Sequence, residues 1–233
     1  MKFEFDEKTH RYYLDGKPLT GVTTILGVIA KPALIGWASN QAVEHIKQNS
    51  DIGDFMGIGS DCYVVKTSTL EEARTAHAKK RDKAADVGTL AHKWIEEHIK
   101  GKDNPITDDI KPMIDNFLKW EEEVKPKYLE TEKRVYSAKN WYAGTLDLML
   151  EIDGEVWLGD IKTGSGIYPE HFFQCAAYQL ALQEMGEYPE IKGHIILNLR
   201  KDGKMDIKKS ISFERDIETF LSALVIYRRL NNQ

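Results

Sequence analysis

The chain has 233 residues, 42% hydrophobic and 30% charged, which are ordinary proportions for a globular protein able to bury a substantial core. Its formal net charge of −5 argues against a protein that coats nucleic acid through bulk positive charge, although a local basic surface is compatible with it. Two cysteines cannot supply a disulfide framework or a four-thiolate iron–sulfur cluster, and no apolar run resembles a signal peptide or spans a membrane, so we expect a cytoplasmic protein.

The chain is predicted to begin with a small hairpin and a helix. Residues 2–5 and 11–14 alternate in polarity, as hairpin strands do. Residues 21–26 predict a short strand or the start of a helix, with threonines that would cap the helix or donate hydroxyls to a phosphate. Residues 32–48 predict a helix with one apolar side, and the Gly-, Asp- and Ser-rich residues 49–67 predict an irregular or mobile connection.

Three more helices are predicted before the main group of strands. Residues 68–85 form a polar helix that opens with the capping pattern Ser68-x-x-Glu71. A solvated charged face is the default interpretation of this helix, but it also carries the densest basic cluster of the chain, which includes Lys79, Lys80, Arg81 and Lys83. Residues 87–100 form a second helix, with His92 on the border of its apolar stripe, and residues 107–124 form a third.

The remaining pattern predicts strands followed by a helix, strands and a closing helix. An Asp-Gly turn joins two of the strands into a hairpin, and a proline and a glycine bound the first helix. The strands are expected at residues 128–136, 144–152, 156–162, 191–199 and 204–209, and the helices at 169–185 and 212–230. Three antiparallel strands, a helix and a further strand predict an α/β (α+β) fold that is not doubly wound.

Charged residues stand at the ends of two apolar strands. Side chains alternate along a strand, so Asp160 and Lys162 should point to the same side, while the hairpin should bring Asp147 towards Asp160. Charges beside a core must meet each other or a cation. A structural Asp–Lys pair is one interpretation. The other is a site for a hard divalent cation bound through oxygen.

Five motifs in register resemble those of the PD-(D/E)XK nucleases, specifically the RecB-like exonuclease branch. They span residues 86–182 and are Gly88-x-x-x-His92, Glu132-x-x-Val135, Gly144-Thr145-Leu146-Asp147, Asp160-Ile161-Lys162 and Gln174-x-x-x-Tyr178. The opening from Tyr12 through Thr24 also resembles the start of phage and mitochondrial genome-maintenance members.

The resemblance implies a restriction-endonuclease-like core with a mixed central sheet flanked by helices. We assign this core to residues 86–233, and an N-terminal, mainly helical extension with the hairpin and basic helix to residues 1–85. We expect the two to pack as one compact unit. The resemblance also implies the cytoplasm of a bacterium or of a phage-infected host cell, without a membrane partner.

The same resemblance implies the roles of the site residues. His92, Asp147, Asp160 and the main-chain carbonyl of Ile161 would hold Mg²⁺ or Mn²⁺, as one or two ions and without an iron–sulfur cluster. Lys162 would orient or deprotonate the attacking water. Glu132 would help through a water on the metal or through a second metal, with Glu130 as the alternative. Oxygen ligands with one imidazole fit these ions, whereas structural zinc favours thiolates or more histidines.

Several other residues are candidates for contact with DNA. Gln174 and Tyr178 would steady the site and touch the phosphodiester, or would form a hydrogen-bonded polar edge on a packed helix. Trp141 and Tyr142 would pack in the core or stack on bases. The further candidates for DNA binding are Thr145, Thr163, Lys79, Lys80, Arg81 and Lys83.

The sequence thus predicts a metal-dependent deoxyribonuclease. We expect an exonuclease that hydrolyses phosphodiester bonds at DNA ends, favours single strands and serves recombination, repair or replication. A helicase, recombinase or single-strand-binding protein would supply the DNA, since the chain lacks helicase motifs. The alternatives are a structure-specific or restriction-type endonuclease of the same fold, which would cut circular DNA, and a catalytically silent DNA-end-binding protein. A CRISPR-associated relative is disfavoured because two cysteines cannot ligate the cluster that such proteins typically carry.

Overall fold

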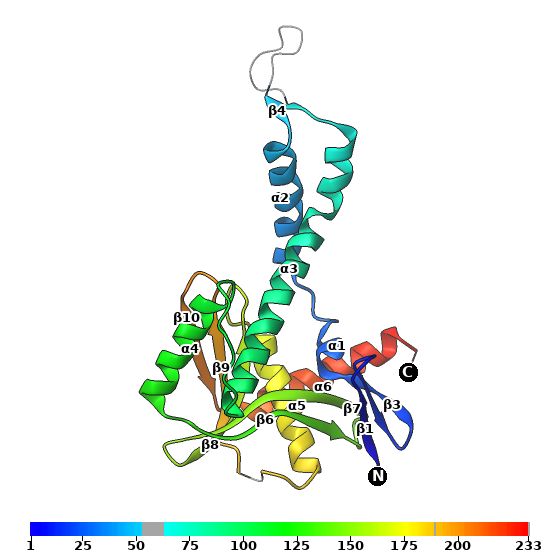
Figure 1. Ribbon diagram of the computed structural model, residues 1–233. Helices are drawn as coiled ribbons and strands as arrows, with labels where there is room; N and C mark the ends of the chain where they lie inside the picture. Colours follow the sequence, from blue (N-terminus) through cyan, green and yellow to red (C-terminus); the bar gives the residue numbers. More distant parts are fainter. Residues whose placement is uncertain (53–62, 189, 233) are drawn as a thin grey trace. The chain divides into compact units, whose positions relative to one another are not determined.

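The computed structural model describes residues 1–52, 63–188 and 190–232 (Figure 1). Most of the predicted connection, and Cys62 with it, lies outside the described residues. Chain packing divides the protein into two compact units, one made of Met1–Ile29 and Leu90–Gln233 and the other of Ala30–Thr89. The domain boundary placed after residue 85 stays a prediction.

The first unit is built on one mixed sheet. Strand order is β1-β2-β3-β7-β8-β9-β10, and β6 pairs with β7 as well. The β3–β7 and β8–β9 pairs are parallel and the other pairs of this sheet are antiparallel. The strands are β1 (Phe3–Asp6), β2 (Arg11–Leu14), β3 (Lys17–Gly21), β6 (Lys127–Ser137), β7 (Tyr142–Ile152), β8 (Glu155–Lys162), β9 (Gly193–Leu199) and β10 (Met205–Ser210).

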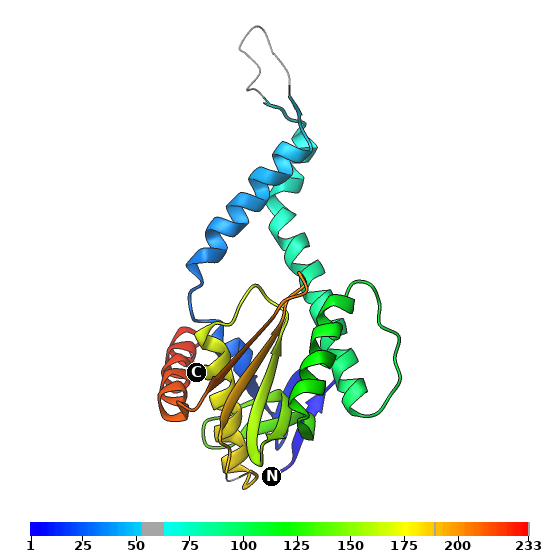
Figure 2. The same cartoon turned by 90° about the vertical axis from the view of Figure 1, so that its left-hand side faces the viewer.

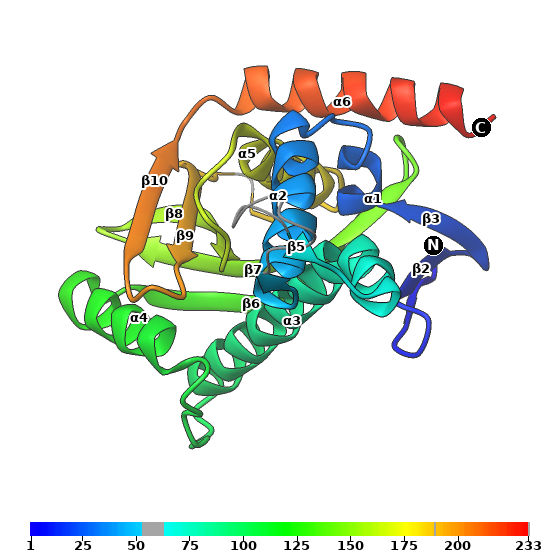
Figure 3. The ribbon, with the colours of Figure 1, turned by 90° about the horizontal axis from the view of Figure 1, so that it is seen from above.

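Helices cover both faces of this sheet. Figures 2 and 3 show α5 (Pro169–Glu184) and α6 (Phe213–Leu230) on one face and α4 (Lys111–Val124) on the other. All residues of β9 and most of β7 and β8 are buried, as expected of strands covered on both sides. A central mixed sheet flanked by helices is the fold class predicted from the sequence, which is therefore confirmed.

Three local predictions need correction. The two helices expected at residues 68–85 and 87–100 are one helix, α3 (Thr67–Ile99), since a single Gly88 weakens a helix without ending it. Lys17–Gly21, which we did not assign, forms β3 and leads into α1 (Val22–Leu26). Gly21 is the N-cap of α1 without a side-chain cap, so the threonines that follow it do not cap the helix.

The second unit pairs α2 (Pro32–Gln48) with the first part of α3. Lys80 Nζ donates to Gln41 Oε1 at 2.8 Å, and the short strands β4 (Asp51–Ile52) and β5 (Tyr63–Val64) are antiparallel. No residue of α2 is buried, although its sequence has an apolar side. Among the described residues, no helix of the chain is long and apolar enough to cross a membrane.

A buried histidine on β9 makes stability depend on pH. His194 is fully buried, its Nε2 lies 2.7 Å from Gln179 Oε1, and burial lowers its pKa to about 4. The unfolded chain takes up this proton as pH falls through about 6.5, whereas the native state does so only near the lowered pKa. The stability that His194 contributes is therefore complete above about pH 6.5 and is lost as pH falls towards the folded pKa.

We expect the wild type to lose about 2 kcal/mol more stability than His194→Gln between pH 7 and pH 5, as measured by urea unfolding. Glutamine keeps a polar amide near Gln179 but does not titrate. His10→Gln, which changes an exposed histidine, should follow the wild type. Equal pH dependence in the wild type and His194→Gln would contradict this prediction.

Candidate metal centre

The candidate site lies where β7 changes partners. On one edge β7 pairs with β3 at Tyr142 and Ala143 and with β8 only from Leu148 onwards. Between these positions, residues 144–147 of β7 pair with neither β3 nor β8. There, a side chain replaces the ladder, because Asp147 Oδ2 accepts a hydrogen bond from the Ile161 backbone N–H at 2.7 Å. The motif aspartate thus bridges two diverging strands.

Three potential metal ligands converge at this point. One donor atom each of His92, Glu132 and Asp147 lies within 4.8 Å of the others, and all three residues are half-buried. His92 Nδ1 is 3.7 Å from Asp147 Oδ2. They come from α3, β6 and β7, so the predicted helix-borne histidine does meet the sheet.

Glu132 occupies a strained position in the site. Its neighbours Thr131 and Lys133 pair with Leu148 and Leu146, so Glu132 stands opposite Asp147 across the ladder. Its backbone has φ of 51°, a left-handed conformation that side-chain-bearing residues rarely adopt. Burial, and then the charge of Asp147, raises the pKa of Glu132 to about 7. The fold therefore holds the carboxylates of Glu132 and Asp147 close together against their electrostatic repulsion.

Asp160 is held by Lys162 and Gln174. The Lys162 ammonium is 2.7 Å from both carboxylate oxygens of Asp160, and Gln174 Nε2 donates to Oδ1 at 3.1 Å. Asp160 is 1% exposed, and its Oδ2 has no well-aligned hydrogen bond among the described residues. Burial raises the pKa of Asp160, while the charges of Asp160 and Asp147 outweigh burial and raise the pKa of Lys162. Lys162 therefore stays protonated.

The close approach of the Tyr178 ring explains why the motif that ends at Asp147 begins with a glycine, Gly144. Gln174 Nε2 also donates to the Tyr178 hydroxyl at 3.1 Å, which links the predicted Gln–Tyr pair to Asp160. A Cβ at Gly144 would lie 2.4 Å from the Tyr178 ring, closer than real contacts allow. The absence of a side chain at this strand position therefore lets the tyrosine approach the sheet.

We expect Gly144→Ala to destabilise the chain by about 1–3 kcal/mol, because the buried Tyr178 ring must shift. The shift should also disturb the hydrogen bond from Gln174. Urea unfolding measures the first effect. Gly166→Ala is the matched control, since its Cβ would meet only ordinary contacts at 3.9 Å. Unchanged stability in Gly144→Ala would mean that the ring moves freely.

The other predicted site residues are less closely connected to this cluster. The Ile161 backbone contacts Asp147 through its N–H, and Thr163 follows β8 and is half-buried. Glu130 binds Lys133 at 3.0 Å and is not in the three-residue group. Lys79, Lys80, Arg81 and Lys83 are exposed on the part of α3 that belongs to the second unit. Metal ligation by the Ile161 carbonyl and the contacts of these residues with DNA stay predictions.

The two aromatic candidates for base stacking have structural partners. Tyr142 is fully buried and donates to the Ala177 carbonyl at 2.8 Å, so it belongs to the core. Trp141 is half-buried and donates to the Pro18 carbonyl at 3.0 Å, which ties β7 to the N-terminal hairpin.

One contact of the site was not foreseen. Thr145 Oγ1, two residues before Asp147, lies 2.9 Å from the hydroxyl of Tyr12 on β2. Tyr12 belongs to the opening motif, but nothing in the sequence indicates that β2 and β7 meet.

The residues fit the divalent ion that the motif resemblance implies. One imidazole and carboxylate oxygens are a donor set for Mg²⁺ or Mn²⁺. A cation would also relieve the repulsion between Glu132 and Asp147 and could satisfy the buried Oδ2 of Asp160.

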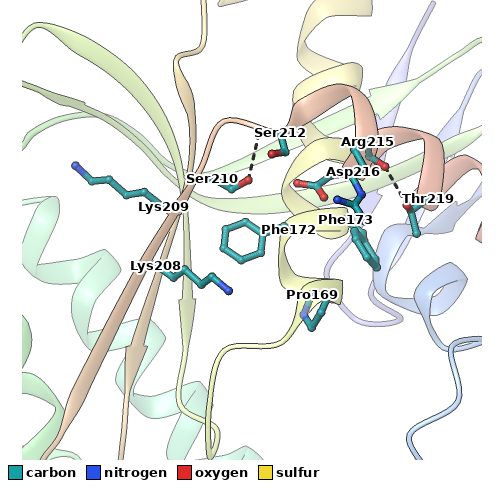
Figure 4. Close-up of a pocket in the computed structure, with 10 residues that line it drawn as sticks. All are labelled: Pro169, Phe172, Phe173, Lys208, Lys209, Ser210, Ser212, Arg215, Asp216 and Thr219. Atoms are coloured by element: carbon teal, nitrogen blue, oxygen red, sulfur yellow. Dashed lines mark hydrogen bonds between the residues drawn. The ribbon is translucent and has the colours of Figure 1, made fainter.

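A separate cavity of about 350 Å³ lies between α5, β10 and α6 (Figure 4). It is lined by Pro169, Phe172, Phe173, Lys208, Lys209, Ser210, Ser212, Arg215, Asp216 and Thr219. None of the predicted site residues lines it, so it does not replace the cluster at His92 as the candidate site.

Comparisons with known proteins leave the family open. No protein-family model and no curated protein matches the chain. Among solved structures, the crystal structure of SSO0001 is similar to this chain with a TM-score of 0.30 and 12% sequence identity. The matched region covers 49% of this chain and 56% of the SSO0001 chain. The chain thus spans little more than half the length of that protein. An alkaline exonuclease from Laribacter hongkongensis is similar with a TM-score of 0.31 and 12% sequence identity. The matched region covers 64% of this chain and 89% of the exonuclease chain. Similarities this weak identify neither a family nor an activity.

Proposed function

We propose that the chain is a metal-dependent deoxyribonuclease that hydrolyses phosphodiester bonds at DNA ends, with a preference for single strands. One observation carries the proposal: His92, Glu132 and Asp147 present ligand atoms within 4.8 Å, next to a strand end whose Asp160 is locked to Lys162. A structural Asp160–Lys162 ion pair does not require two further carboxylates, Glu132 and Asp147, held in a repulsive arrangement beside it.

The protein's own groups would divide the work as follows. His92, Glu132 and Asp147 would hold the divalent ion, and Asp160, which Lys162 and Gln174 hold in place, would be a further ligand. When bound, the ion supplies a more acidic water and a counter-charge for the phosphoryl oxygens. The charges of Asp160 and Asp147 raise the pKa of Lys162 in the metal-free site, and with the ion bound Lys162 would orient or deprotonate the attacking water.

The test is a cleavage assay on linear single-stranded, linear duplex and circular DNA, with Mg²⁺, Mn²⁺ or a chelator. We expect cleavage of linear DNA that the chelator abolishes. Comparable cleavage of circular DNA would favour the endonuclease alternative. A wild type as inert as Lys162→Met in every mixture, but able to bind DNA ends, would favour the silent binder.

Metal binding is tested independently of activity. Titration calorimetry with Mn²⁺ should show weaker binding to His92→Ala than to the wild type, and His10→Ala serves as the exposed-histidine control. A role for the basic helix, and a helicase, recombinase or single-strand-binding partner, belong to this proposal as expectations. Measuring the cleavage of linear DNA with and without such a partner protein would test whether the partner supplies the DNA.

A further inference from the structure

A pair of hydroxyl groups connects the N-terminal hairpin to the candidate metal centre. The Tyr12 hydroxyl lies 2.9 Å from Thr145 Oγ1, across 133 residues of chain. Thr145 and Asp147 are two residues apart on β7, so their side chains face the same side of the sheet. Both are half-buried. Tyr12 therefore acts on the face that carries the metal centre without being a candidate ligand itself.

Tyr12 is fixed in place by its own strand and by aromatic neighbours. On β2 it pairs with Phe5 on one side and Leu19 on the other, and its ring stacks against Phe3 at 6.2 Å with an interplanar angle of 7°. The ring centroids of Phe5 and Tyr12 are 4.8 Å apart. The hydroxyl is thus presented to Thr145 by a rigid platform.

The platform is attached to β7 immediately before Thr145. Strand β3 pairs in parallel with β7 at Tyr142 and Ala143, and the Trp141 indole donates to the Pro18 carbonyl. Leu14 and Leu19 are buried with Ala143 beneath the hairpin. These attachments limit how far Tyr12 and Thr145 can move relative to each other.

Either hydroxyl can donate in this contact, and the two directions differ in what they leave available on Thr145. A phenol has one hydrogen to donate, and a threonine hydroxyl has one hydrogen and two acceptor lone pairs. When Tyr12 donates to Thr145 Oγ1, the Thr145 hydrogen points away from Tyr12 and is available to a ligand. A phosphate oxygen is an acceptor without hydrogens, so it matches an oriented hydroxyl donor.

We propose that Tyr12 is a positioning residue that orients the Thr145 hydroxyl to donate to a backbone phosphate of the DNA strand bound at the metal centre. The inference rests on the proposed function and adds the N-terminal hairpin to the substrate site. Because the contact is to a phosphate that is present throughout the reaction, it strengthens substrate binding rather than the chemical step.

The experiment compares Tyr12→Phe, Thr145→Val and the double variant on a single-stranded oligonucleotide. KM and kcat are measured with Mn²⁺, and Kd is measured with Ca²⁺, which also takes oxygen ligands. We expect each single variant to raise KM and Kd about fivefold, the effect of one lost hydrogen bond, with kcat within about twofold of the wild type. The double variant should be no weaker than Thr145→Val, because Tyr12 acts through Thr145.

Two further variants separate positioning from structure. Tyr13→Phe removes a hydroxyl from the opposite side of the same strand and should behave as the wild type. Thr145→Ser keeps the hydroxyl and should restore binding to near the wild-type level. A merely structural Tyr12 would lower the thermal midpoint of Tyr12→Phe and shift kcat and KM together, which would overturn the inference.

The remaining outcomes distinguish the inference from the proposed function. If the wild type cleaves DNA and Tyr12→Phe matches it in KM and Kd, or if the effects of the two substitutions multiply, the inference fails and the nuclease stands. If the wild type binds the oligonucleotide with the expected dependence on Tyr12 and Thr145 but never cleaves it, the contact is upheld and the nuclease is overturned.

Discussion

Lys162→Met is expected to lower metal-dependent cleavage by about a thousandfold and to destabilise the fold by about 3 kcal/mol. Both effects have one cause. The ammonium lies 2.7 Å from both oxygens of Asp160, which is 1% exposed, so its removal leaves a buried carboxylate without a counter-charge. The cleavage assay and urea unfolding measure the two losses on the same protein.

The double variant Asp160→Asn/Lys162→Met separates stability from activity. Removing both charges should recover most of the stability lost by Lys162→Met, because no uncompensated charge then remains buried. Cleavage should stay as low as in either single variant. Lys192→Met is the control, since it breaks an equally short but half-exposed pair with Glu155 and should change neither quantity measurably. Full activity in Lys162→Met would remove the basis of the proposed mechanism.

Local rules predicted those parts of the site that depend on one strand or one turn. Alternation along β8 placed Asp160 and Lys162 on the same side, and the structure has them in contact. The turn at Asp153 and Gly154 predicted the β7–β8 hairpin, whose two strands are largely buried in the structure. The fold class followed from the order of these elements.

Features that depend on distant chain segments could not be predicted in the same way. The parallel pairing of β3 with β7 joins residues about 120 positions apart, and no local signal marks it. The contact between Tyr12 and Thr145 depends on that pairing. The left-handed backbone conformation of Glu132 could not be predicted either, since the sequence around it is that of an ordinary strand. His92 and Asp147 were expected to share a site and lie in one cluster with Glu132, while metal ligation by Asp160 stays a prediction.

Glu132→Gly is expected to be more stable than Glu132→Ala by about 1 kcal/mol, although both should lose cleavage. A left-handed φ of 51° strains alanine but not glycine, and this difference exceeds the entropy that glycine loses on folding. Thermal and urea unfolding of the two variants, which share the loss of the carboxylate, isolate the backbone contribution.

Position 130, on the same strand, provides the matched control. Glu130 is not among the described residues with a positive φ, so Glu130→Gly should be less stable than Glu130→Ala, the reverse of the order at Glu132. The same order at both positions would show that Glu132 is not strained. If the Gly and Ala variants rank in opposite orders of stability at the two positions, and cleavage is lost only at Glu132, the strained backbone at Glu132 lowers stability but holds its carboxylate opposite Asp147. This is expected where a backbone conformation serves a binding site.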